Sequence, residues 1–134
     1  MELWRVYLPK KTLEQIEQKI WDEEITFPSS LVAKCYRLRK KPINLFSIED
    51  FRLLISQEIS LSILIPFALK ILEEDSLAEG DLYPGDLLHA VIKVGPSFWE
   101  INDVQYKATK EILNTHLELG STGYPIKHIP SWFL

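Results

Sequence analysis

The chain has 134 residues, of which 46% are hydrophobic and 11% aromatic, and a net charge of −4. This composition excludes a disordered chain, and the length predicts one domain over residues 1–134 that folds without disulfide or metal. The single cysteine, Cys35, cannot form an internal disulfide, which is typical of a reducing compartment. No leader pattern and no apolar run of the ~20 residues that span a bilayer are found, so we expect a soluble, cytoplasmic protein.

The negative charge is concentrated in the middle of the chain. Residues 1–57 carry a balance of +2 and residues 104–134 a balance of +1, whereas residues 58–103 carry −7. An acidic surface attracts basic partners and repels phosphate backbones, so direct binding to nucleic acid is disfavoured. The alternative interpretation is that these acidic side chains only keep the protein soluble.

The N-terminal part predicts one extended segment and one helix. Residues 2–8 show a rough alternation of apolar and polar side chains, typical of a short edge strand or an extended arm. Thr12 is expected to cap a helix over residues 13–22, where apolar side chains recur on one face.

A second helix is expected from Ser29 or Ser30 to about Lys40. Its C-terminal end carries four cations, Arg37, Arg39, Lys40 and Lys41. Cations there complement the negative end of the helix dipole by roughly 0.3–1 kcal/mol each. We favour this structural explanation over a phosphate-binding site.

Two further helices form the apolar centre of the sequence. Ser47 precedes two acids and an apolar stripe, which predicts a helix start. Residues 59–75 are apolar on most sides and predict the central buried helix, in which Pro66 either introduces a kink or starts a second helical segment. The C-terminal end of this helix carries Glu73, Glu74 and Asp75. The dipole disfavours negative charge there, so local electrostatics do not explain these acids, which is a mild indication of a functional use.

Residues 77–99 read as a corner, with turn-forming residues around a short helix. Pro84 is expected to open that helix at its first position, and residues 87–92 supply its apolar face. Gly95-Pro96 is expected to end it.

A last helix is expected from Val104, with Asp103 as its cap, to about residue 119, where Gly120 stops it. The tail over residues 121–134 ends in three apolar residues and is expected to pack down. Together these elements predict a mainly α-helical, compact bundle of five to seven helices, with at most a minor N-terminal strand.

No arrangement for catalysis or metal binding is found in the sequence. The three histidines, His89, His116 and His128, have no metal-ligand spacing, and Cys35 lies on an apolar helix face, typical of a buried, inert thiol. Asp81 and Asp86 have the spacing of an acid–base pair, but a loop acid and a first-turn acid are equally typical of capping. We therefore expect no enzyme, no cofactor and no metal.

Several stretches together resemble the immunity proteins of bacterial contact-dependent growth inhibition (CDI) systems. They are LVAKCYRLRKKPI (31–43), FSIEDFRLLISQEISLSILIPFALKILEED (46–75) and LAEGDLYPGDLLHAVIKV (77–94) with Phe98-Trp99. The ordered series is more specific than any one of its members. It covers about residues 29–100, and residues 1–28 and 101–134 show no pattern that can be quoted for the family.

The resemblance implies a small cytoplasmic protein that binds and neutralises the C-terminal toxin domain of a cognate effector. Such toxins are often nucleases, and nucleases tend to be basic because they bind phosphates. An acidic inhibitor then mimics the charge of the substrate and steers association. The competing function is that of a helical adaptor or scaffold protein, which uses the same acidic face for another basic protein.

The charge pattern assigns toxin binding to acidic side chains of the −7 segment, with aromatic side chains as anchors. The candidate residues are Glu73, Glu74, Asp75, Glu79, Asp81, Tyr83, Asp86, Trp99, Glu100 and Asp103. For the two aromatic residues, packing in the core or in a loop is the alternative interpretation.

Overall fold

The computed structural model describes residues 2–21, 29–118 and 129–133. Its α-helices are α1 (Leu13–Glu17), α2 (Ser30–Arg39), α3 (Ile48–Ser56), α4 (Leu61–Glu74), α5 (Asp86–Ile92), α6 (Pro96–Glu100) and α7 (Asp103–Glu118). Three short 3-10 helices are η1 (Leu3–Tyr7), η2 (Ile43–Leu45) and η3 (Ser131–Phe133). No strand occurs in these ranges, and the mainly α-helical fold with up to seven helices is confirmed.

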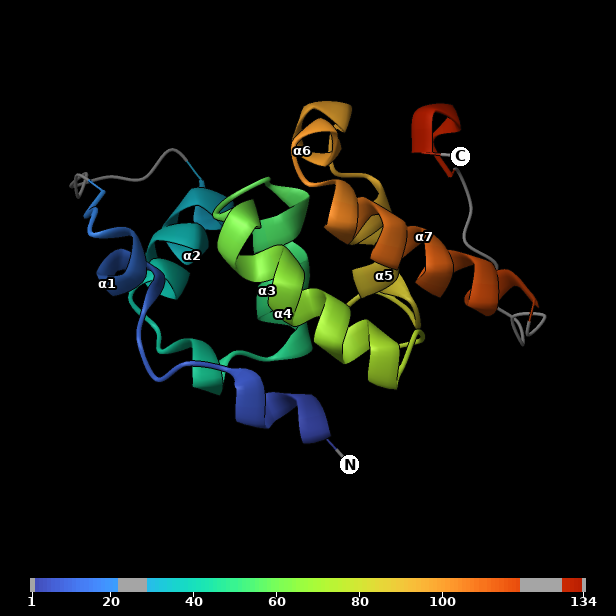
Figure 1. Cartoon of the computed structure of the whole chain (residues 1–134). Helices are drawn as coiled ribbons and strands as arrows, with labels where there is room; N and C mark the ends of the chain where they lie inside the picture. The colour runs from blue at the N-terminus through green and yellow to red at the C-terminus, as the bar shows by residue number, and fades with distance from the viewer. Residues whose placement is uncertain (1, 22–28, 119–128, 134) are drawn as a thin grey trace.

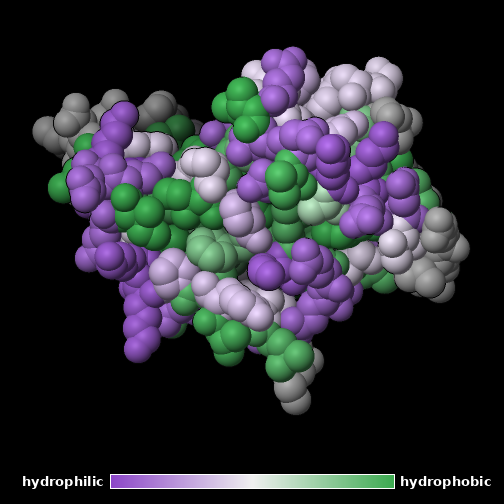
Figure 2. All heavy atoms as spheres, viewed as in Figure 1, coloured by the Kyte–Doolittle hydropathy of each residue, from purple (hydrophilic) through white to green (hydrophobic). Residues whose placement is uncertain are grey.

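Helix α4 lies at the centre of the molecule and contacts η1, α3, α5 and α7. Figure 1 shows α1 and α2 at one end and α5 and α7 at the other, with α3 and α4 between them and α6 at the top of the view. The face turned to the viewer is largely hydrophilic, with hydrophobic side chains visible between the hydrophilic ones (Figure 2). Helix α4 therefore connects the two ends of the fold.

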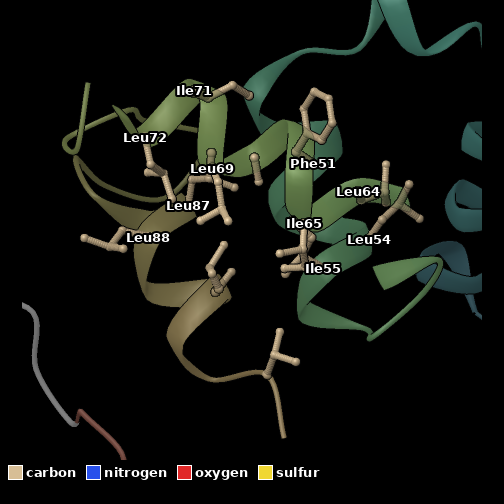
Figure 3. Packing of buried hydrophobic residues seen from close by; sticks show 14 of the residues in the cluster. Phe51, Leu54, Ile55, Leu64, Ile65, Leu69, Ile71, Leu72, Leu87 and Leu88 are labelled. Carbon is tan, nitrogen blue, oxygen red and sulfur yellow. The ribbon is translucent and has the colours of Figure 1, made fainter. Parts of the chain in front are cut away.

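The hydrophobic core lies where α3, α4 and α5 meet (Figure 3). Its fully buried members include Phe51, Leu54 and Ile55 of α3, Leu64, Ile65 and Ile71 of α4, and Leu87 and Leu88 of α5. Helix α4 runs through Pro66 as one element, so a second helical segment starting there is wrong. Pro66 removes one backbone hydrogen bond, and the burial of the apolar residues around it offsets that loss.

Three predicted helix starts are confirmed. The hydroxyls of Thr12, Ser29 and Ser47 each accept a hydrogen bond from the backbone N–H three residues later, at 3.1–3.2 Å. Ser47 forms a full capping box, because the Asp50 carboxylate accepts the Ser47 N–H at 3.0 Å. Local sequence was sufficient here, since a cap involves only neighbouring residues.

The expected N-terminal strand is wrong, because residues 3–7 form η1. The Glu74 carboxylate at the end of α4 accepts the N–H groups of Leu3 and Trp4, each at 2.9 Å. This carboxylate caps the first turn of η1, and the described residues offer no neighbouring strand for pairing.

Helix α1 is five residues shorter than predicted and ends at Glu17, followed by Gln18 in the left-handed conformation (φ 53°). Beyond it, the buried Arg39 guanidinium binds the Glu17 carboxylate and donates to the Lys19 carbonyl at 2.7 Å. It also lies 4.4 Å from the centre of the Trp21 ring. These contacts with Arg39, which is distant in the sequence, hold the chain just after α1. A local periodicity pattern does not detect them.

The basic end of α2 is partly explained by ion pairs. Arg39 pairs with Glu17, and the Lys41 ammonium lies 2.7 Å from the Asp50 carboxylate. Two of the four cations thus have structural acidic partners, which supports the structural explanation of this cluster.

The corner differs from its prediction at both prolines. Helix α5 begins at Asp86 after Gly85, whose φ of +88° is a left-handed conformation that favours glycine, so Pro84 lies in the preceding turn. Pro96 begins α6, a helix that the sequence pattern did not predict. Proline is favoured at a first helical position, because no N–H is needed there.

Helix α7 begins at Asp103, one residue earlier than predicted. Its expected end near residue 119, the stop at Gly120 and most of the tail lie outside the described residues. Within the part of the tail that is described, Phe133 is fully buried.

Candidate partner-binding surface

The ten candidate residues lie in three places. The end of α4 holds Glu73, Glu74 and Asp75. The loop before α5 (residues 77–85, the corner loop) holds Glu79, Asp81 and Tyr83, and Asp86 follows it as the first residue of α5. The α6–α7 corner holds Trp99, Glu100 and Asp103. Seven of these side chains are exposed, Tyr83 is half-buried, and Asp86 and Trp99 are buried.

At the end of α4, two of the three acids have structural partners. Glu74 caps η1, and the Asp75 carboxylate accepts the Leu77 N–H at 3.0 Å. These contacts explain why both acids lie at the unfavourable end of a helix dipole. Glu73 is exposed and has no hydrogen-bond or ion-pair partner in the part of the chain that the structure describes.

The Asp86 carboxylate, only 2% exposed, holds the corner loop. It accepts the backbone N–H groups of Gly80 at 2.7 Å, Leu82 at 3.0 Å and Tyr83 at 3.4 Å. A buried carboxylate without such donors would be costly, so these bonds account for its place in the interior. Asp86 is therefore a capping residue, which was the alternative to an acid–base pair. Its carboxylate caps the backbone of the loop that precedes its own helix.

A second buried carboxylate, Glu49 of α3, binds the same loop. It accepts the Asp81 N–H at 2.9 Å and two hydrogen bonds from Arg52, both at 2.6 Å. The hydrogen bonds from Arg52 lower the pKa of Glu49, against the effect of burial, and raise the pKa of Arg52. Arg52 Nε lies 3.9 Å from Asp86 Oδ2, so the guanidinium serves both acids.

Gly80 is required by this packing. A Cβ at position 80 would lie 2.5 Å from Oε1 and 3.1 Å from the Cα of Glu49. Any larger residue would push the loop away from the carboxylates that hold it.

Tyr83 and Asp81 face different surroundings in this loop. The Tyr83 hydroxyl is hydrogen-bonded to Nδ1 of His89, and burial, followed by the charge of Asp86, raises the pKa of Tyr83. Asp81 has only its backbone N–H engaged, and its side chain is exposed. The loop therefore fixes its backbone inward and presents Asp81 outward.

At the α6–α7 corner, Trp99 is a core residue. It is 5% exposed, and its indole N–H donates to the Val94 carbonyl at 2.9 Å. Its ring centre lies 5.0 Å from that of Phe98, 6.1 Å from Tyr106 and 5.9 Å from Phe133. The core interpretation of Trp99 therefore fits its place, whereas Glu100 and Asp103 beside it are exposed.

A groove of about 610 Å³ lies between α4 and α7 (the α4–α7 groove). It is lined by Leu72, Glu73, Glu74, Ser76, Ala108, Glu111, Ile112 and Thr115. It thus brings two of the candidate acids together with Glu111, which the sequence analysis did not select. Glu111 lies outside the −7 segment, and only the packing of α7 on α4 brings it close to the others.

The described residues show no group of three or more histidine, cysteine, aspartate or glutamate side chains that could hold a metal ion. Cys35 is buried, and burial raises the pKa of its thiol, as expected of an inert cysteine. His128 lies outside the described residues. None of the helices in the described ranges is long and apolar enough to cross a membrane.

Comparison with protein-family models identifies a family. A family model described as CDI immunity proteins matches residues 15–110. This range includes α2 to α6 and extends beyond the quoted stretches at both ends. Neither the curated proteins nor the solved structures contain a match to this chain.

Proposed function

The chain belongs to the CDI immunity protein family, and on that premise we propose that it binds and neutralises the C-terminal toxin domain of a cognate contact-dependent growth inhibition effector. The match over residues 15–110 is the observation that carries the proposal. Neutralisation proceeds by stoichiometric binding in the cytoplasm, without a cofactor and without turnover. The whole chain acts as one immunity domain.

The proposed contact surface consists of the candidate side chains that solvent reaches and that have no hydrogen-bond or ion-pair partner among the described residues. These are Glu73, Glu79, Asp81 and Glu100. Exposed Asp103 joins them, because its ion pair with Lys107 at 2.9 Å is itself exposed and contributes little to stability. Asp86 and Trp99 support the surface from inside.

The charge of this surface favours a basic toxin, and a nuclease is the class we propose. A nuclease active site must attract phosphates, so an acidic inhibitor is attracted by the same field. Complementary charge raises association rates from about 10⁵–10⁶ M⁻¹s⁻¹ toward 10⁸ M⁻¹s⁻¹ or more at low salt. Fast association matters for immunity, because the toxin has to be captured before it acts.

Co-expression with the toxin tests the proposal. The toxin domain encoded immediately upstream should stop growth when expressed alone, and this chain should restore growth and co-purify with the toxin at a 1:1 ratio. A toxin domain from an unrelated effector is the control and should stay toxic. If the upstream toxin stays active and unbound in the presence of the chain, the proposal is wrong.

A further inference from the structure

The α4–α7 groove has an apolar floor and acidic walls. Leu72, Ala108 and Ile112 form the apolar part, and Ser76 and Thr115 add hydroxyl groups. In Figure 2, hydrophobic surface is visible between hydrophilic side chains on the face where α4 and α7 lie in Figure 1. A groove of this kind fits a side chain with a long apolar stem and a polar head.

Every charged side chain that lines the groove is acidic. Glu74 is committed to η1, whereas Glu73 and Glu111 have no hydrogen-bond or ion-pair partner among the described residues. The nearest cations along α7, Lys107 and Lys110, do not line the groove, and Lys110 lies over the Tyr106 ring. The negative charge of the groove is therefore not compensated by the residues that line it.

We propose that the α4–α7 groove is the docking site for a basic segment of the toxin domain. A lysine or arginine of the toxin lays its aliphatic stem on Ala108 and Ile112 and places its charge between Glu73 and Glu111. The hydroxyls of Ser76 and Thr115 accept further hydrogen bonds from a guanidinium. This inference rests on the proposed function and names the part of the surface that contributes most to it.

A second copy of this chain is a poor occupant of the groove. Two copies that met through it would bring six carboxylates together, and like charges placed opposite each other in an interface are strongly unfavourable. A basic partner removes this repulsion, and the basic toxin domain proposed above meets that requirement.

Removing the negative charges of Glu73 and Glu111 tests the inference. The double variant Glu73→Gln/Glu111→Gln should bind the purified toxin domain at least tenfold more weakly, with a flatter salt dependence of the association rate. The matched control is Glu14→Gln/Glu58→Gln, which removes the same charge from side chains outside both the groove and the proposed contact surface. We expect it to change the dissociation constant by less than about threefold.

A third variant fills the groove without removing an acid. Ala108→Arg keeps a good helix former on α7 and places a guanidinium where we assign the toxin's cation, so affinity should fall more than in the double variant. Circular dichroism and thermal denaturation check that each variant is folded, and the glutamine pair decides the question if Ala108→Arg does not fold.

The outcomes separate the two proposals. If the wild-type chain does not bind the toxin, the proposed function fails. If the wild type binds and the groove variants bind as tightly as the wild type, the function stands and the groove inference is overturned. A larger loss in the control pair than in the groove pair overturns it as well.

Discussion

Asp81 and Asp86 lie five residues apart, but their side chains have different surroundings. The Asp86 carboxylate is buried and accepts three backbone N–H groups, while the Asp81 carboxylate is exposed and has no hydrogen-bond or ion-pair partner among the described residues. The acidic composition of this segment therefore combines two kinds of acid. One kind holds the loop in place, and the other gives the surface its charge.

The first stability prediction follows from this difference. Asp86→Asn removes the charge that faces Arg52 and replaces one acceptor by an amide donor, so at least one loop N–H loses its partner. We expect the free energy of unfolding to fall by about 1–3 kcal/mol, measured by urea denaturation. The control, Asp81→Asn, should stay within about 0.5 kcal/mol of the wild type. Equal stabilities for the two variants would show that the carboxylate does not hold the loop.

At the scale of elements, the last described segment of the chain packs on α6 and α7. The Tyr106 hydroxyl donates to the Phe133 carbonyl at 2.6 Å, and the Phe133 ring contacts the rings of Trp99 and Tyr106 edge-on. Helix α6 has only five residues and makes its main packing contacts with α7. The aromatic cluster is thus what joins α6, α7 and η3.

We predict that Phe133→Ala destabilises the protein. Phe133 is fully buried, and large-to-small changes at such sites cost about 3–5 kcal/mol. Thermal denaturation should show a clear drop in the midpoint. Trp132→Ala is the neighbouring control, and its loss should be smaller because Trp132 is 41% exposed. A Phe133→Ala midpoint equal to that of the wild type would contradict the packing described here.

The elements that sequence predicted well are those defined by near neighbours. The caps at Thr12, Ser29 and Ser47 and the apolar stripes of α3 and α4 were all found from local patterns. The errors occur where a distant residue decides the conformation. The Glu74 carboxylate accepts a backbone N–H at the start of η1, and the Arg39 guanidinium binds the backbone just after α1.

The candidate surface was predictable to a smaller extent. A charge count found the acidic segment, but it could not distinguish Glu73 from Glu74, whose carboxylate caps η1. It also missed Glu111, because sequence distance hides the packing of α7 on α4. Which acids have intramolecular partners depends on tertiary structure.

At the scale of the whole molecule, acid should weaken the fold in two steps. Burial lowers the pKa of His116 below its ordinary 6.5, and Arg52 lowers the pKa of Glu49 below its ordinary 4.5. In both cases the unfolded chain binds the proton more readily. The stability from each group is therefore complete above its ordinary pKa and is lost as the pH falls through the lower, folded value.

Urea denaturation between pH 7.5 and 3.5 checks this prediction. The wild type should lose stability first below about pH 6.5 and again below about pH 4.5. His116→Gln should remove the upper step, and Glu49→Gln should reduce the lower one, where other carboxylates also titrate. Wild-type stability that stays constant from pH 6.5 to pH 5 would contradict the role of His116.

The two buried carboxylates under the corner loop have a consequence for the entropy of binding. The backbone N–H groups of residues 80–83 are all bound by Asp86 or Glu49, so a loop without regular structure is nevertheless held in one conformation. Ordering a flexible backbone costs about 1–2 kcal/mol per residue. Folding has already met this cost, so a partner that touches the loop loses little conformational freedom on contact.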